Sequence, residues 1–297
     1  MQIFRLLLCL LMMNFLLPSS ASADDAKLAN GLSQVYQTWR QAMVNKNYNQ
    51  WRAVTSSSRQ VSVQNRLVSE KKPFPQALFA LPAAPPAVDQ MKLIEVNQRG
   101  STAKAVYFGK ADFGGAIDPH NNLLVISYLA EGGRWRYDGL EIVNLSQLKD
   151  VRSQLEKGDL SYVQGEAFQA DGKMPQRQIP VTGAKYIAKV YAYCPGREIQ
   201  AQVNRISRHN FQDIMHSEVI IGGAKDGRNE ISFAIKALPG AQGNEEMALR
   251  VYLFSQVEGV KPIKVFEYQL AKGEVAKPHG TESFVVTADH VRQLMGR

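Results

Sequence analysis

Residues 127–141 read SYLAEGGRWRYDGLE, and this stretch decides how the first half of the chain is interpreted. Glu131-Gly-Gly133 is a turn sequence, and segments rich in strand-forming residues, 123–129 and 134–143, lie on either side of it. A glycine turn between two such segments predicts an antiparallel hairpin. A second turn at 97–100 joins two more such segments. The sequence therefore predicts an antiparallel sheet with strands at 91–96, 102–108, 123–129 and 134–143.

Helices are predicted before this sheet. Over residues 26–44 the apolar residues recur at spacings of three and four, so they share one face of an amphipathic helix. Shorter helical stretches are predicted around 48–53 and 58–69. Residues 72–88 contain five prolines. Because proline cannot donate a backbone hydrogen bond, this segment is predicted to be a loop packed by its own apolar side chains.

Helices followed by a curved antiparallel sheet resemble the NTF2-like family, which includes the SnoaL-like proteins. The resemblance covers residues 26–145 and is carried by Trp39, by the Tyr48/Trp51 pair, and by the strand Gly133-Arg-Trp135-Arg-Tyr137. It implies an α+β cone with a pocket between the helices and the sheet, used in that family for small-molecule binding, isomerase or dehydratase chemistry, or interaction alone.

The resemblance implies a ligand pocket but assigns no catalytic pair. The aromatic residues expected to line the pocket are Trp39, Tyr48, Trp51, Tyr107, Tyr128 and Trp135. The candidates for polar pocket groups are Tyr36, Tyr48, Tyr107, Tyr128, Asp112, Asp118 and His120. Buried tyrosines are more often packing residues whose hydroxyl finds a backbone partner.

The N-terminus has the parts of a cleavable signal peptide over residues 1–23. Arg5 supplies the positive charge, residues 6–17 form the apolar run, and Ala21-Ser-Ala23 is the cleavage sequence. The run is shorter than the roughly 20 apolar residues of a spanning helix, and a proline follows it. We therefore expect a periplasmic or secreted mature chain without a transmembrane segment. Cys9 lies too early in the run to serve as a lipid attachment site.

Cleavage would leave Cys194 as the one thiol, so no intrachain disulfide is expected, and Cys194 is expected to be a buried apolar residue. The formal charge of +8 would fall to +7 without Arg5. That charge favours polyanionic partners such as acidic glycans. The basic residues are scattered among acidic ones, so nucleic acid is not an expected partner. No cofactor motif is present, and no cofactor is expected.

Residues 179–297 are predicted to form an all-β antiparallel sandwich with a short C-terminal helix. Short alternating segments separated by turns favour an immunoglobulin-like or C2-like shape, although no specific family is indicated. Residues 24–150 would form the first domain, and residues 151–178 a linker or edge segment. The predicted strands lie at 184–193, 198–206, 218–221, 230–237, 248–255, 263–270 and 283–287.

Residues 208–218, RHNFQDIMHSE, are a candidate metal site under one condition. If the segment were helical, His209, Asp213 and His216 would share a face and could bring three ligands to one zinc ion. The alternative is a polar loop between strands with solvated histidines. We favour the loop, and no metal is predicted.

Three functional hypotheses remain. The favoured one is a non-enzymatic exported protein of the bacterial cell envelope that binds a ligand or another envelope protein, because no catalytic, metal or phosphate-binding motif is present. The second is a pocket enzyme, which requires a carboxylate or histidine inside the cone. The third is glycan binding by the sandwich through a platform of Tyr191, Tyr193, Tyr252 and Tyr268. The family resemblance also implies a homodimer.

Overall fold

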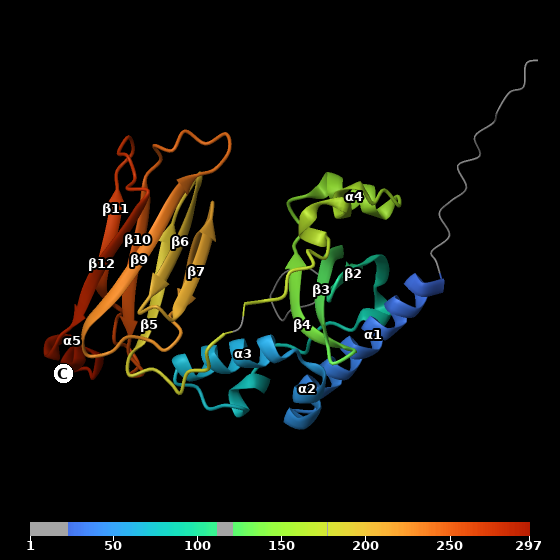
Figure 1. Cartoon of the computed structure of the whole chain (residues 1–297), viewed down its shortest axis with the longest axis horizontal. Coiled ribbons are helices and arrows are strands. Elements are labelled where there is room, and N and C mark those ends of the chain that lie inside the picture. The colour runs from blue at the N-terminus through green and yellow to red at the C-terminus, as the bar shows by residue number, and fades with distance from the viewer. Residues whose placement is uncertain (1–22, 112–120, 177) are drawn as a thin grey trace, which may run out of the picture.

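The computed structural model describes residues 23–111, 121–176 and 178–297. Within them a helical N-terminal region is followed by three antiparallel sheets of four strands each (Figure 1). The predicted signal peptide lies outside the described residues, apart from Ala23, which is the first residue of a helix. Asp112, Asp118 and His120 also lie outside them.

The first unit, defined here as α1 to η4, contains the predicted helices and the predicted sheet. Its four strands pair in chain order, and the turn at 132–133 joins β3 to β4 as predicted. Its elements are α1 (Ala23–Val44), α2 (Tyr48–Val54), α3 (Ser57–Ser69), η1 (Gln76–Phe79), η2 (Val88–Gln90), β1 (Lys92–Arg99), β2 (Thr102–Lys110), β3 (Asn121–Glu131), β4 (Arg134–Val143), α4 (Lys149–Glu156), η3 (Ser161–Gln164) and η4 (Glu166–Phe168).

Local capping explains where α2 and α3 begin. The Asn47 side chain accepts a hydrogen bond from the Gln50 backbone N–H at 3.0 Å, and the Ser56 hydroxyl accepts one from the Arg59 N–H at 3.0 Å. Such caps satisfy backbone donors that have no partner within the helix. The Ser56 N–H also donates to the Tyr137 carbonyl at 2.8 Å. The start of α3 is therefore tied directly to β4.

Both faces of the first sheet are buried. On one face Leu124 and Ile126 pack with Leu32 and Tyr36 of α1. On the other face Leu123 packs with Val106 and Val125 and with α4 to η4, through Leu155, Val163 and Phe168.

The segment 151–178, predicted to be a linker or an edge strand, is therefore mostly a helical cover for this sheet. The Asn97 side chain donates to the Phe168 carbonyl at 3.1 Å and accepts from the Ala170 N–H at 2.6 Å. Lys104 Nζ donates to the Ala167 carbonyl at 2.6 Å. These bonds hold the segment on the sheet as far as residue 170.

The second unit, β5 to α5, contains two four-stranded sheets, ordered β11-β10-β5-β8 and β12-β9-β6-β7. Alternating residues of the two sheets fill one shared apolar core, which includes the buried Cys194 as predicted. The elements are β5 (Ile187–Tyr193), β6 (Arg197–Val203), β7 (Ser207–Gln212), β8 (Met215–Val219), β9 (Gly227–Ala237), β10 (Met247–Phe254), β11 (Ile263–Leu270), β12 (His279–Val286) and α5 (Ala288–Leu294).

One of these eight strands, β7, was not predicted. Its burial alternates strictly, with Ser207, His209 and Phe211 pointing inward. Two of those three residues are polar, so the segment lacks the apolar alternation by which a strand is recognised in a sequence. His209 is nevertheless buried, because its Nε2 and Nδ1 atoms make hydrogen bonds to Ser207 Oγ at 2.8 Å and to Glu218 Oε2 at 2.7 Å.

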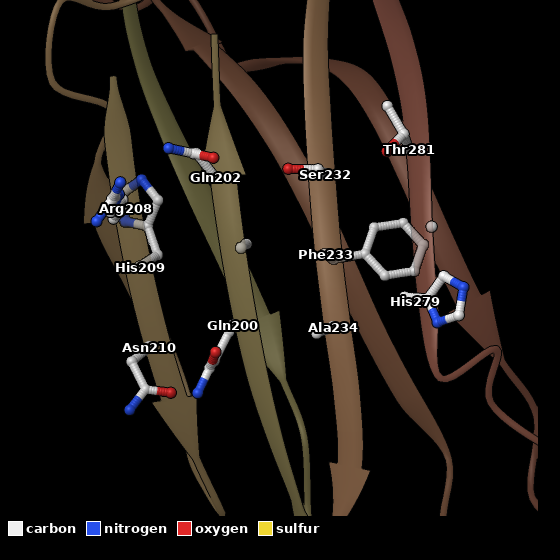
Figure 2. Close-up of a pocket in the computed structure, with 12 residues that line it drawn as sticks. Gln200, Gln202, Arg208, His209, Asn210, Ser232, Phe233, Ala234, His279 and Thr281 are labelled. Atoms are coloured by element: carbon white, nitrogen blue, oxygen red, sulfur yellow. The ribbon is translucent and has the colours of Figure 1, made fainter. Parts of the chain in front are cut away.

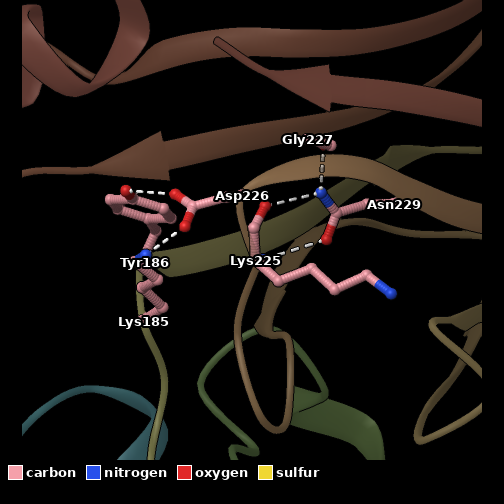
Figure 3. A network of polar contacts seen from close by, with 6 residues as sticks. All are labelled: Lys185, Tyr186, Lys225, Asp226, Gly227 and Asn229. Atoms are coloured by element: carbon pink, nitrogen blue, oxygen red, sulfur yellow. Dashed lines mark hydrogen bonds and ion pairs between the residues drawn. The ribbon is translucent and has the colours of Figure 1, made fainter. Parts of the chain in front are cut away.

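A polar network closes the end of the second unit where the chain enters it (Figure 3). Asp226 accepts hydrogen bonds from Lys185 Nζ and from the Tyr186 hydroxyl. Beside them the Asn229 amide donates to the carbonyls of Lys225 at 2.9 Å and Gly227 at 3.0 Å, and accepts from the Lys225 N–H at 3.0 Å. The network fixes the turn that precedes β9.

The two units are joined by hydrogen bonds from α3. The Asn65 side chain is 1% exposed, and it donates to the Ile179 carbonyl and accepts from the Val181 N–H, both at 2.9 Å, in the segment that leads into β5. The Ser69 hydroxyl accepts from the Gly222 N–H at 2.8 Å. Asn65 and Ser69 are four residues apart and so lie on one face of the helix. That face of α3 carries the contact with the second unit.

Candidate functional site

A cavity of about 260 Å³ lies in the first unit, between the helices and the proline-rich loop. Its walls come from α1, α2 and α3, from the loop, and from β4. The residues that line it are Trp39, Met43, Trp51, Arg59, Val63, Arg66, Leu78, Leu81, Pro82, Ala83, Ala84, Pro85, Pro86, Tyr137 and Leu140. The cavity is therefore largely apolar, like most small-molecule sites in proteins.

The loop is held in place by its own backbone carbonyls. The Tyr36 hydroxyl donates to the Pro86 carbonyl at 2.8 Å, and Arg40 Nε donates to the Pro85 carbonyl at 2.7 Å. Proline has no N–H to satisfy, so a proline pair can be buried once its carbonyls are bonded. Pro85 and Pro86 are both buried. The loop thus forms a fixed wall of the cavity.

Stacked aromatic rings form the opposite wall. Trp39 of α1 and Tyr137 of β4 stack with ring centroids 3.9 Å apart and an interplanar angle of 19°. The indole Nε1 of Trp39 is buried and has no hydrogen-bond partner among the described residues. A buried donor without a partner carries a free-energy cost. Burial raises the pKa of Tyr137, so its hydroxyl stays neutral.

Two guanidinium groups supply the charge at this site. Arg59, Val63 and Arg66 follow one another at spacings of four and three on α3 and therefore lie on the same helix face. Arg59 is half-buried and Arg66 is exposed, and neither side chain makes an ion pair or hydrogen bond to another described residue. No Asp, Glu or His occurs among the described residues that line the cavity. The site is therefore cationic as well as apolar.

Asp138 is a carboxylate beside this site, since it follows the cavity residue Tyr137 in β4. It occupies the bulge where β4 pairs irregularly with β3, and its Oδ1 accepts a hydrogen bond from the Ser56 hydroxyl. Burial raises the pKa of this carboxyl, while the Ser56 bond and the charge of Arg59 oppose the rise. Asp138 does not line the cavity.

The predicted pocket residues divide into two groups. Trp39 and Trp51 line the cavity. Tyr48 instead stacks on Trp51 at 5.8 Å, and Trp135 packs, partly buried, on the same core. Tyr107 and Tyr128 are buried in the core between α1 and the sheet. Aromatic side chains thus fill the space between α1 and the sheet where the resemblance implies a pocket. The cavity lies beside that space, between the helices and the proline-rich loop.

The sequence interpretation missed Arg59, Arg66 and the role of the proline-rich loop. The spacing of Arg59, Val63 and Arg66 was visible in the predicted helix at 58–69. Nothing in that spacing shows that the loop folds over this helix face, because the loop is placed by hydrogen bonds from α1.

The three candidate metal ligands do not converge. The segment forms β7 and β8 rather than a helix, and the two strands belong to different sheets. Both ring nitrogens of His209 are bonded, and Asp213 Oδ1 accepts from the Gly196 N–H at 2.8 Å. Across residues 23–111, 121–176 and 178–297, no group of three or more His, Cys, Asp or Glu residues could hold a metal ion.

The four tyrosines proposed as a glycan platform lie on two sides of a sheet. Tyr191, Tyr193 and Tyr252 lie half-buried on the outer face of sheet β11-β10-β5-β8. Tyr268 packs inward, where its ring stacks on Phe233 at 4.9 Å and its hydroxyl accepts from the Lys277 N–H at 3.0 Å. The four rings therefore do not form one platform.

Comparisons with known proteins leave the site to be interpreted from its own geometry. In the part of the chain with described structure, no helix has both the length and the apolar character needed to cross a bilayer. No family model, no curated protein and no solved structure matches this sequence.

Proposed function

We propose that this protein is an exported binding protein of the bacterial cell envelope, and that it holds a small amphipathic anion in the cavity of the first unit. The observation that carries the proposal is the lining itself, in which apolar and aromatic walls meet the two guanidinium groups of Arg59 and Arg66. A volume of about 260 Å³ suits a small molecule. The ligand class is therefore a compact apolar body with one acidic group.

The chemistry of the walls indicates how such a ligand would lie. Its apolar body would contact Trp39, Val63 and Leu78, since removing apolar surface from water is favourable. Its carboxylate, sulfate or phosphate would face Arg59 and Arg66. Guanidinium groups bind such oxyanions through paired, charge-assisted hydrogen bonds.

The finer fold and location assignments belong to the same proposal. Helices on a four-stranded antiparallel sheet support an NTF2-like first domain, and two facing sheets support an immunoglobulin-like or C2-like second domain. The signal-peptide sequence at residues 1–23 supports a periplasmic or secreted location. The homodimer remains a prediction from the family resemblance.

A pocket enzyme is the less favoured function. Isomerase or dehydratase chemistry needs a general base in contact with the substrate. The described lining supplies arginines and aromatic rings and no carboxylate or imidazole. Binding without turnover therefore accounts better for the residues present.

Octanoate and 1-octanol test the proposal, because they share an apolar chain and differ in charge. We expect octanoate to quench the fluorescence of Trp39 and Trp51 with higher affinity than octanol. Arg59→Ala with Arg66→Ala should weaken octanoate binding about tenfold, the effect of losing a charge-assisted bond, and leave octanol binding unchanged.

Arg52→Ala is the matched control, since Arg52 is exposed on α2 and does not line the cavity. It should leave both affinities unchanged. Equal binding of the two ligands, or octanoate binding that survives the double substitution, would contradict the proposal.

A further inference from the structure

A second depression, of about 680 Å³, lies on the outer face of sheet β12-β9-β6-β7, the face opposite the core (Figure 2). Its floor is the sheet itself, and its sides are side chains from all four strands. The residues that line it are Gln200, Ala201, Gln202, Arg208, His209, Asn210, Ser232, Phe233, Ala234, His279, Gly280 and Thr281.

Strand register arranges the polar side chains in two rows. Thr281 pairs with Ser232, Ser232 with Gln202, and Gln202 with Arg208. In the next row of the same face His279, Ala234, Gln200 and Asn210 pair in the same order. Residues two apart on a strand share a face, so both rows point to solvent.

The β9 side chain in each row is short, and this makes the face concave. Ser232 and Ala234 lie between the longer side chains of β6 and β7 and those of β12 (Figure 2). The floor is closed from beneath by the Phe233 ring. A Cβ atom at Gly280 would lie 2.5 Å from Phe233 Cζ, so only glycine lets the ring fill this space.

The lining matches a ligand that is both polyhydroxylated and acidic. It contains three side-chain amides and two hydroxyls, which can each donate and accept hydrogen bonds. Arg208 adds a fixed positive charge, and no Asp or Glu occurs among the described lining residues. The neighbouring Glu198 is already paired with Lys236 Nζ at 2.6 Å and accepts a hydrogen bond from Gln200 Nε2 at 2.8 Å, which leaves the amide oxygen of Gln200 available. The charge of the depression is therefore complementary to an anion.

Several of these groups have no protein partner. Gln202, Ser232, Thr281 and His279 make no side-chain hydrogen bond to another described residue. Arg208 bonds only the side-chain oxygen of Gln176, through one of its nitrogens. Because guanidinium carries five N–H donors, most of its capacity remains available.

We propose that this face binds an acidic oligosaccharide, with the carboxylate of a uronic acid on Arg208 and sugar hydroxyls on Gln200, Gln202, Asn210, Ser232 and Thr281. This site is separate from the cavity of the first unit and from the four tyrosines, which lie on the other sheet. It makes the protein a binder of two ligands, one in each unit.

The test uses a tetrasaccharide of galacturonic acid and its carboxyl-reduced counterpart, titrated into the full chain by calorimetry. We expect the acidic sugar to bind at least tenfold more tightly than the neutral one. Arg208→Ala should remove that difference, and Gln202→Ala should weaken both sugars alike. Ala234→Trp should abolish binding by filling the depression, with the melting temperature unchanged because Ala234 is exposed.

Arg134→Ala is the control, since Arg134 is exposed on the hairpin of the first unit. It should leave both sugar affinities unchanged. The proposal is overturned if neither sugar binds, if the neutral sugar binds as tightly as the acidic one, or if Ala234→Trp binds like the unmodified chain. Octanoate binding should persist in Ala234→Trp, which separates failure of this site from failure of the cavity.

Discussion

The sheet of the first unit is covered on both faces, whereas each sheet of the second unit is covered on one. In β3 four successive residues, 123–126, are buried, because odd and even positions meet different layers. In β5 the burial alternates at every residue, since only one face meets the core. The burial pattern of these two strands therefore indicates whether one or both faces of their sheet are covered.

The same difference decides which kind of site each unit can offer. Where helices and a loop cover a sheet, a gap in their packing becomes a partly enclosed, largely apolar cavity, as at Trp39 and Val63. Where a face is left to solvent, its side chains must be polar, and a hollow in it is an open polar site, as at Gln202 and Arg208. The covered sheet thus offers an apolar site, and the sheet with one face in solvent offers a polar site.

The largest expected effects compare neighbouring residues on one strand of each unit. Leu123 and Leu124 of β3 are both buried, on opposite faces of the sheet. Changing either to Ala should lower the free energy of unfolding by about 2–5 kcal/mol. In β10, Leu249→Ala should cost as much, whereas Arg250→Ala on the exposed face should cost less than about 1 kcal/mol.

Urea denaturation measures these values, with tryptophan fluorescence for the first unit, which holds all three tryptophans, and circular dichroism for the whole chain. If Leu123→Ala were tolerated while Leu124→Ala was not, the α4 side of the sheet would not be a true core. The comparison between the units would then fail.

The next effect concerns the end of the second unit that is closed by the polar network around Asp226 and Asn229. Asn229 is 1% exposed, and its amide makes the bonds to Lys225 and Gly227. Asn229→Ala should lower the free energy of unfolding by about 1–3 kcal/mol, because buried backbone groups lose their partners. Asn210→Ala, on the exposed face, should change it by less than about 0.5 kcal/mol. A similar loss in both variants would show that the network is unimportant.

The smallest effect is a difference in pH dependence between the units. Burial raises the pKa of Asp138 in the first unit, so the folded state binds its proton more readily than the unfolded state. Its contribution favours folding at low pH and is lost as the pH rises from the unfolded pKa to the raised folded value. Bonds from Lys264 and Arg250 lower the pKa of Glu267 in the second unit. Its contribution is present above the unfolded pKa and is lost as the pH falls.

The free energy of unfolding, measured at about pH 3 and about pH 7, distinguishes these opposite pH dependences. Asp138→Asn, which keeps the acceptor for Ser56, should gain stability relative to the unmodified chain as the pH rises. Glu267→Gln should lose stability relative to it over the same change. If both variants gained stability relative to the unmodified chain as the pH rises, or both lost it, the contrast between the two units would be contradicted.

Much of the fold was predictable from local patterns. The strands 134–143 and 263–270 were predicted with the bounds that the structure has, because a glycine turn marks the start of the first and the end of the second. The strand β7 was missed, since its inward side chains are Ser207 and His209 as well as Phe211. Those polar residues are compatible with burial only because Glu218 and neighbouring backbone groups bond them.

The sequence by itself determined the three helices before the first sheet, the short C-terminal helix, most strands, the proline-rich loop and the absence of a local metal or catalytic motif. Each of these depends on residues close together in the chain. The tertiary structure alone decided that residues 151–170 cover the first sheet, that Arg59 and Arg66 face a cavity beside Trp39, and that Arg208 joins a row with Thr281. Such groupings join residues that are distant in the chain, and they are set by packing and strand register, which no local pattern encodes.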